Sequence, residues 1–146
     1  MWEKFSNNEY HELNLDDKIN ILELSIERVD ELKKIKVKEL SFHEDTKELI
    51  NKMQVINVDD VIGLARPVYG DISWLDILDN KYCHKNRNFD LYNKETFDYV
   101  LMNEVQDDYP VVIEYKKKYY IAGNGLHRLT MAKCLGNKKA RVIVRM

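Results

Sequence analysis

The residues that decide the fold are Ile121-Ala122-Gly123-Asn124-Gly125-Leu126-His127-Arg128. A β-rich run ends at Ala122, and a helix over residues 126–135 is expected to follow and to stop at Gly136. Glycine between a strand and a helix lets the chain turn sharply and lets a ligand approach the main chain. The first amides of the helix are unpaired and lie at the positive end of its dipole. The stretch therefore predicts a strand–loop–helix unit that can hold an anion such as phosphate.

The first turn of this helix contains a local electrostatic conflict. His127 and Arg128 stand there, and a cation at a helix N-terminus opposes the dipole unless an anion lies between them. Two interpretations follow. In the first, the phosphates of a ligand occupy the site. In the second, there is no ligand: Arg128 points into solvent or pairs with a carboxylate that folds over the loop, for instance that of Asp59, Asp60 or Asp71, and His127 is satisfied within the core.

The residues on either side of the loop predict a sheet. Residues 111–115 and 119–122 are β-rich and are joined by the turn Lys116-Lys117-Lys118, so we expect an antiparallel hairpin. Residues 140–144 form a further strand, which is expected to join the same sheet. With the helices expected elsewhere, the chain belongs to the α+β class, with a small mixed sheet and flanking helices.

The first 54 residues predict a helical hairpin that packs on the rest of the domain. Residues 16–39 have apolar side chains at spacings of three and four, which indicates one long amphipathic helix. A second helix is expected to begin at Asp45 and to place Leu49, Ile50 and Met53 on its apolar face. We therefore divide the chain into an extension over 1–54 and a domain over 55–146.

The middle of the chain predicts shorter elements. Residues 55–62 suggest a strand and a turn that ends at Gly63, and residues 74–78 suggest a short helix. Residues 79–93 are polar and aromatic without a period, which is typical of a long loop. Residues 94–106 predict another helix.

Composition restricts the partners. The chain of 146 residues has a net charge of −2, but residues 114–146 contain nine Lys or Arg against one acid, Glu114. Such a basic third can attract a nucleotide or a nucleic-acid backbone, and it can also be a solvated face. There is no apolar run long enough to span a bilayer and no secretory signal, so a cytoplasmic location without a membrane partner is expected.

The cysteines and histidines do not suggest a metal or a disulfide framework. Cys83 and Cys134 lack the spacing of a metal site, and the four histidines lack that of a zinc site. No protein-encoded metal is predicted.

The last third of the chain resembles the N-terminal domain of ParB proteins and its sulfiredoxin and free-serine-kinase relatives. These families share a hairpin, a helix start of the form G-x-H/R-R, a helix end of the form A-x-x-x-G, and a closing strand. Here these features correspond to residues 110–128, 132–136 and 141–144, and an arginine near proline after an opening strand corresponds to Arg66-Pro67. The resemblance covers roughly residues 55–146, and the helical hairpin lies outside it.

This resemblance implies a nucleotide-binding domain. Its phosphates would rest on the turn formed by Gly123, Asn124 and Gly125, with His127 and Arg128 in contact and Arg66 on the opposite wall. The implied ligand is a nucleoside di- or triphosphate, with Mg²⁺ as an accompanying ion, and the implied activities include nucleotide hydrolysis and small-molecule phosphorylation. The alternative is a nucleic-acid-binding or nuclease-like module that uses the basic C-terminal third.

The sequence departs from individual subfamilies. Sulfiredoxins have a nucleophilic cysteine where this chain has Leu126, and Cys134 would lie roughly 12 Å along the helix from that position. Reductase activity is therefore not expected. A DNA-partitioning role is not expected either, because no helix-turn-helix follows in the sequence. The free-serine kinases use a carboxylate as a base, for which Asp59 and Asp60 are the candidates, although an acidic pair is also common in turns.

Overall fold

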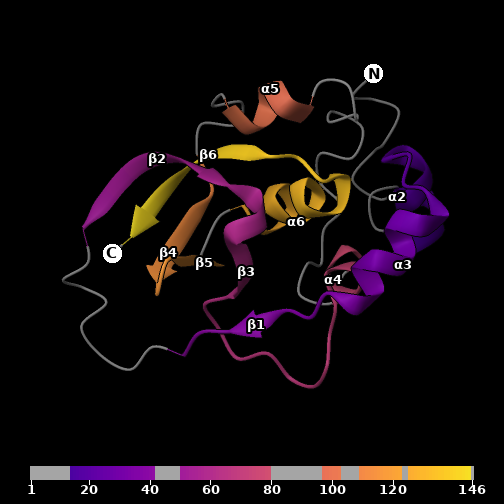
Figure 1. Cartoon of the computed structure of the whole chain (residues 1–146), viewed down its shortest axis with the longest axis horizontal. Coiled ribbons are helices and arrows are strands. Elements are labelled where there is room, and N and C mark those ends of the chain that lie inside the picture. The colour runs from indigo at the N-terminus through magenta and orange to yellow at the C-terminus, as the bar shows by residue number, and fades with distance from the viewer. Residues whose placement is uncertain (1–13, 42–49, 80–96, 103–108, 123–124, 146) are drawn as a thin grey trace.

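The computed structural model describes residues 14–41, 50–79, 97–102, 109–122 and 125–145. Within these residues the chain forms helices on a mixed sheet (Figure 1), which confirms the α+β class. The helices are α2 (Leu15–Ile21), α3 (Ile26–Lys34), α4 (Trp74–Leu78), α5 (Phe97–Met102) and α6 (Leu126–Leu135), with the 3-10 turn η3 (Val58–Asp60). The strands are β1 (Lys38–Glu39), β2 (Asn51–Asn57), β3 (Val61–Leu64), β4 (Val111–Tyr115), β5 (Lys118–Ile121) and β6 (Lys139–Arg145).

The strands of the described chain form one six-stranded sheet in the order β1-β3-β5-β4-β6-β2. β4 and β5 pair antiparallel as a hairpin, and β6 runs parallel to β4. Both features of the predicted C-terminal sheet are confirmed. β3 joins the hairpin as a parallel neighbour of β5, with Leu64 opposite Ile121, and β2 pairs antiparallel with β6 along its whole length.

The turn η3 requires the sheet to curl. Three strands separate β2 from β3 in the sheet, so a flat sheet would place them about 19 Å apart. Only the three residues of η3 join Asn57 to Val61, and four peptide steps span at most roughly 14 Å. The sheet must therefore bend until its two sides approach each other, as the path of β2 into β3 in Figure 1 shows.

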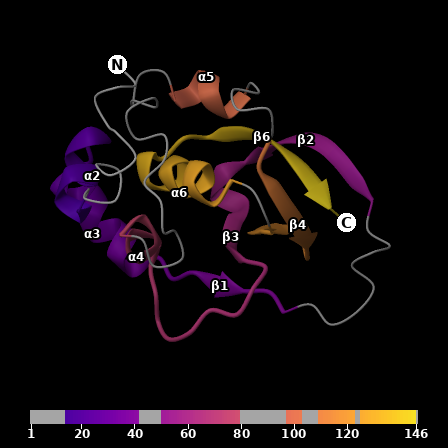
Figure 2. The same ribbon diagram turned by 180° about the vertical axis from the view of Figure 1, so that it is seen from behind.

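Helix α6 lies between the curled sheet and helices α3 and α4, and the view from behind shows the same arrangement (Figure 2). Because both sides are covered, α6 is buried almost all round, including polar residues that an amphipathic helix would expose. At the C-terminal end of α6, Arg28 of α3 donates hydrogen bonds to the carbonyl oxygens of Cys134 (2.8 Å) and Lys133. Leu129, Met131 and Ala132 of α6 lie at the centre of the main core.

The N-terminal region differs from the predicted hairpin. Instead of one helix over 16–39 there are two, because Glu23 takes a left-handed φ of 55° and the Ser25 side chain caps α3. The chain then enters the sheet as β1, beside β3. The predicted second helix is also wrong at Met53, which lies in β2, and the expected boundary at 54/55 falls within this strand.

Several other predictions can be placed. The helix over 74–78 is confirmed as α4, and the helix expected over 94–106 is present as α5 for residues 97–102. Residues 45–49, most of the loop predicted over 79–93, residues 94–96 and residues 103–106 lie outside the described residues. Among the helices that the structure describes, none has the length and apolar character to cross a membrane.

Candidate functional site

The predicted phosphate site is the start of helix α6. Gly125 is the N-cap residue, with a left-handed φ of 97°, and no side-chain hydrogen bond caps the helix there. Strands β3 and β5 end at the same edge of the sheet, since they are parallel and Leu64 is opposite Ile121. The helix thus begins beyond the carboxyl ends of two adjacent parallel strands, where α/β proteins commonly bind ligands. Gly123 and Asn124 lie outside the described residues.

Gly125 has a structural role that does not depend on a ligand. A Cβ atom at this position would lie 2.3 Å from the Cβ of Pro110 and 2.6 Å from its Cα. Together with the positive φ, this contact strongly disfavours any residue with a Cβ atom at this position. Pro110 precedes β4, so the close approach fixes the start of α6 against the sheet. The glycine alone is therefore not evidence for phosphate.

Arg128 and His127 differ in exposure. Arg128 is 5% exposed, whereas His127 is partly buried, and each of them engages another group in the structure. A buried guanidinium is costly unless it is paired. Arg128 is therefore part of the packed interior at the helix start and not a solvated arm, while His127 is the more accessible of the two.

Arg66 reaches the same end of the sheet. The amide of Ala65 donates to the carbonyl oxygen of Ile121 (2.8 Å), so Arg66 follows directly after the last contact between β3 and β5. Its side chain is exposed. The structure therefore brings Arg66 to the edge from which the chain continues into α6.

The segment that follows Arg66 is held by Glu39. This carboxylate accepts hydrogen bonds from the Val68 amide (2.8 Å) and the Ser41 hydroxyl (2.6 Å). These two donors lower the pKa of Glu39, the Ser41 hydroxyl having the larger effect. No sequence pattern predicts this contact, because Glu39 and Val68 are 29 residues apart.

Asp59 and Asp60 lie at the other end of α6. The Nζ atom of Lys133 contacts the carbonyl oxygens of Val58 (3.4 Å) and Asp59 (3.3 Å), and Lys133 is about 10 Å along the helix from Leu126. The Asp60 carboxylate pairs with Lys118 (2.9 Å), and the hydrogen bond from Lys118 is the main cause of its lowered pKa. The structure does not bring these two candidates to the start of α6, neither as bases nor as neutralising carboxylates. The third candidate for neutralisation, Asp71, is exposed in the loop before α4.

Cys134 has no access to solvent. It is fully buried, and burial raises the pKa of its thiol to about 12. Since the thiolate is the nucleophile, this cysteine is chemically inert in the folded protein. This environment agrees with the expectation that Cys134 cannot replace the nucleophilic cysteine of sulfiredoxins.

Two buried lysines were missed by the sequence reasoning. Lys18 is fully buried and donates to the carbonyl oxygen of Leu78 (2.7 Å), and Lys133 lies over the Trp74 ring at 5.6 Å. Desolvation lowers the pKa of Lys133. The spacing of Lys18 from Leu15 and Leu22 places it on the buried stripe of its helix, and this is the signal that could have found it. Among the described side chains, no group of three His, Cys, Asp or Glu could hold a metal ion.

No protein-family model, curated protein or solved structure matches this chain.

Proposed function

We propose that this protein binds the phosphates of a nucleotide at the start of helix α6. The main support is one observation. An N-terminus without a side-chain cap begins beyond the carboxyl ends of β3 and β5, where Arg66 and His127 also lie. The resemblance of residues 55–146 to ParB and sulfiredoxin-like domains adds support from the sequence.

Each group has a distinct part in this proposal. The first amides of α6 donate to phosphate oxygens, and the helix dipole favours the negative charge. Arg66 is exposed and adds a cation from the neighbouring strand end, while His127 adds a donor from the first turn. Arg128, being buried, supports the positive potential of the site from within the packed interior.

The geometry favours binding over catalysis by the acidic pair. A base must lie within hydrogen-bond reach of the proton that it takes. Asp59 and Asp60 are at the opposite end of α6, and Lys118 already holds the Asp60 carboxylate. A hydrolase or small-molecule kinase would need a carboxylate from elsewhere in the chain.

A thermal-shift panel of nucleoside di- and triphosphates, with and without Mg²⁺, tests this proposal. A ligand at 100 times its Kd that binds only the folded state adds about 2.7 kcal/mol of stability. For a chain of this length, the melting temperature should then rise by roughly 5–10 °C. If millimolar concentrations of every nucleotide leave the melting temperature unchanged, the proposal is wrong.

Arg66→Ala locates the site without disturbing the core, because Arg66 is exposed. We expect the loss of about 1.5–3 kcal/mol of binding free energy, which weakens affinity roughly ten- to a hundredfold. Lys52→Ala is the matched control, since it removes an exposed cation from β2 at the far edge of the sheet. Equal affinities of the two variants would place the ligand elsewhere.

A further inference from the structure

Six lysines surround the turn η3, at the far end of α6 from the proposed nucleotide site. Lys118 binds Asp60 (2.9 Å), and the carbonyl oxygen of Lys138 accepts a hydrogen bond from the Val58 amide (3.0 Å). Lys139 pairs with Asn57 in the sheet. The buried Lys133 donates hydrogen bonds from Nζ to the carbonyl oxygens of Val58 and Asp59 in this turn. We define the exposed members as the η3 lysine surface: Lys116, Lys117, Lys118, Lys138 and Lys139.

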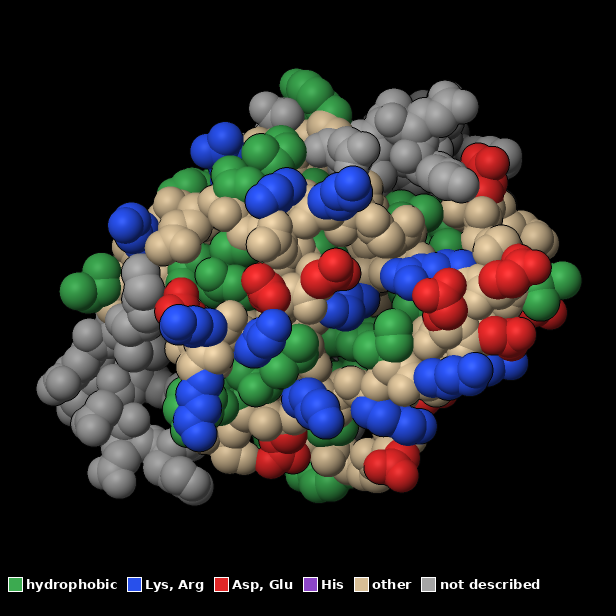
Figure 3. Space-filling view, viewed as in Figure 1, with side chains coloured by type: hydrophobic (Ala, Val, Ile, Leu, Met, Phe, Trp, Pro, Cys, Tyr) green, Lys and Arg blue, Asp and Glu red, His purple; other side chains and the backbone are tan. Residues whose placement is uncertain are grey.

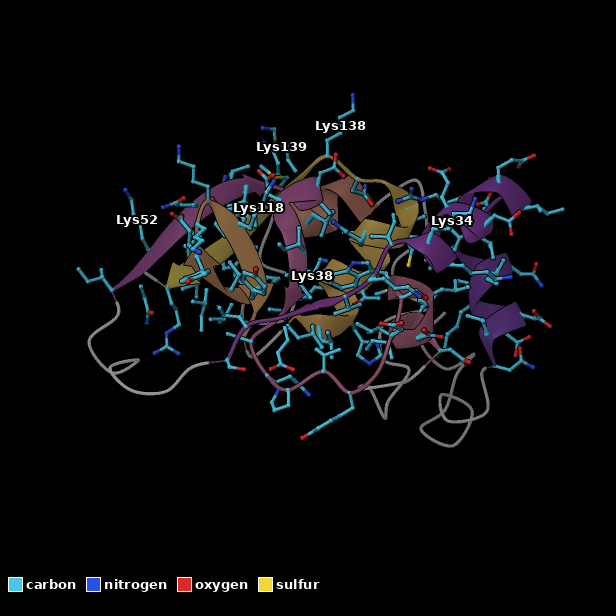
Figure 4. All side chains as sticks on the ribbon, turned by 60° about the horizontal axis from the view of Figure 1, so that its bottom comes forward. Lys34, Lys38, Lys52, Lys118, Lys138 and Lys139 are labelled. Atoms are coloured by element: carbon cyan, nitrogen blue, oxygen red, sulfur yellow. The ribbon has the colours of Figure 1, made fainter. Side chains whose placement is uncertain are left out.

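Among the described residues, Lys118 is the one lysine of this surface that forms an ion pair. Lys117, Lys138 and Lys139 have no ion pair or hydrogen bond from their side chains in the part of the chain that the structure describes. Asp60 is engaged by Lys118, which leaves Asp59 and Glu114 as the nearby described acids. Figure 3 shows Lys and Arg side chains spread over one face of the molecule with acidic groups between them, and in Figure 4 Lys138 and Lys139 project outward with Lys118 below them.

Lysines occupy both central positions of the β4–β5 hairpin turn, where glycine or asparagine would be energetically more favourable. Tyr115 pairs with Lys118, so Lys116 and Lys117 are the two central residues, and their φ values are 53° and 66°. Positive φ at both positions is the pattern of a type I′ turn, in which asparagine and glycine are strongly preferred. A left-handed conformation is unfavourable for a lysine, because its Cβ atom crowds the backbone. Two adjacent cations therefore occupy this turn at a cost to stability, which points to a use for their charge.

We propose that the η3 lysine surface binds the sugar–phosphate backbone of a nucleic acid. Lysine is a compact point charge that contacts phosphate without demanding a fixed geometry, so the binding is independent of base sequence. Tyr115, which is 47% exposed, borders the surface, and the Nζ atom of Lys116 lies over its ring at 5.2 Å from the centroid. The exposed part of the ring offers a base of a single strand a stacking contact. Tyr115 is the one large exposed hydrophobic residue on the described part of this hairpin. Docking to a bilayer instead needs several apolar side chains to insert.

This surface is independent of the nucleotide site. The ten residues of α6 span about 15 Å, and the two regions lie at its opposite ends. Failure of nucleotide binding would leave this proposal intact, and the reverse is also true.

Fluorescence anisotropy with a labelled 20-nucleotide single strand and a 20-base-pair duplex tests the proposal on the full chain, at several KCl concentrations. We expect affinity to fall steeply with salt as counterions are released. Lys138→Glu combined with Lys139→Glu should weaken binding at least about tenfold. The loss of two phosphate contacts should reduce the salt slope by about 1.8 for the duplex and by about 1.4 for the single strand. Lys138→Arg combined with Lys139→Arg keeps the charge and should retain binding within about twofold.

The matched control reverses two adjacent exposed lysines of α3, by Lys33→Glu with Lys34→Glu. It changes the net charge by the same amount and should alter affinity less than about threefold, because the phosphate contacts remain. Circular dichroism confirms that each variant is folded. The proposal is overturned if both glutamate pairs weaken binding equally, if neither oligonucleotide binds at low salt, or if only phosphatidylserine vesicles retain the protein.

Discussion

Glycines with the same backbone conformation in this protein carry different packing constraints. Gly125 and Gly70 both have positive φ, but an added Cβ at Gly125 would collide with Pro110, whereas one at Gly70 would meet no atom within 4 Å. We expect Gly70→Ala to lower the free energy of unfolding by about 1–2 kcal/mol, the cost of a left-handed alanine. Gly125→Ala should cost clearly more, because the backbone of Pro110 must also move.

Urea denaturation of the two glycine variants measures this difference. The pair separates backbone strain from steric exclusion, since φ is similar in both. Equal losses of stability would show that the contact with Pro110 is not a constraint.

The buried thiol of Cys134 makes stability depend on alkaline pH. Its pKa is raised to about 12 in the folded state, whereas an unfolded thiol ionises near 8.5. Stability is therefore full below about pH 8.5 and falls as pH rises toward 12, because only the unfolded chain releases the proton. At pH 10 the loss should be about 2 kcal/mol.

This loss can be isolated by comparing the parent with Cys134→Ala at pH 8 and pH 10. Titrating lysines and tyrosines contribute to both proteins, so the difference between the two pH slopes reports the thiol. Identical slopes would mean that Cys134 ionises in the folded protein.

Residue identity alone could not predict which charged side chains are buried. Arg128 was correctly placed in the first turn of its helix, but its burial follows from the position of α6 between the curled sheet and α3–α4. Asp59 and Asp60 are candidates in the sequence because they follow the expected opening strand and the family resemblance implies a carboxylate base. They lie at the opposite end of α6 because the short turn η3 makes the sheet curl. No sequence pattern predicts this curl.

At the scale of single elements, glycine positions decided which predictions succeeded. Helix α6 has the predicted bounds because Gly125 and Gly136 both take left-handed φ at its ends. The break between α2 and α3 was missed because it lies at Glu23, a residue that seldom has positive φ, while apolar spacing continues across it. The two-residue strand β1 is too short for any alternating pattern to be detected.

Gly63 governs the attachment of β1 to the sheet. A Cβ there would lie 2.1 Å from the carbonyl oxygen of Lys38, so Gly63→Ala must push β1 away from β3. We expect the amide of Leu40, which donates to Leu64 (2.9 Å), to lose protection from hydrogen exchange. The amide of Ala122, which donates to Val111 across the hairpin, is the internal control and should stay protected. Unchanged protection at Leu40 would contradict this role.

At the scale of the whole molecule, the N-terminal segment is part of the core. Leu22 and Leu32 are fully buried in the same cluster as α6, and Lys18 bonds to the end of α4. A fragment of residues 55–146 would also lose β1 and the first four residues of β2. We therefore expect this fragment not to fold, which would be seen as poor dispersion of its amide resonances. A cooperative unfolding transition in the fragment would show that the segment is dispensable.

The pairing of β2 with β6 also determines how long β2 lacks its partner during translation. Residue 57 pairs with residue 139 and residue 51 with residue 145, so β2 leaves the ribosome long before its partner exists. At translation rates of about 5–20 residues per second, the first of these pairs must wait roughly 4–16 s. During that interval β2 offers an unpaired edge with Met53 and Val55 among its side chains, both of which stay substantially exposed in the finished sheet. Such an edge can pair with other chains, so this interval exposes the nascent protein to aggregation.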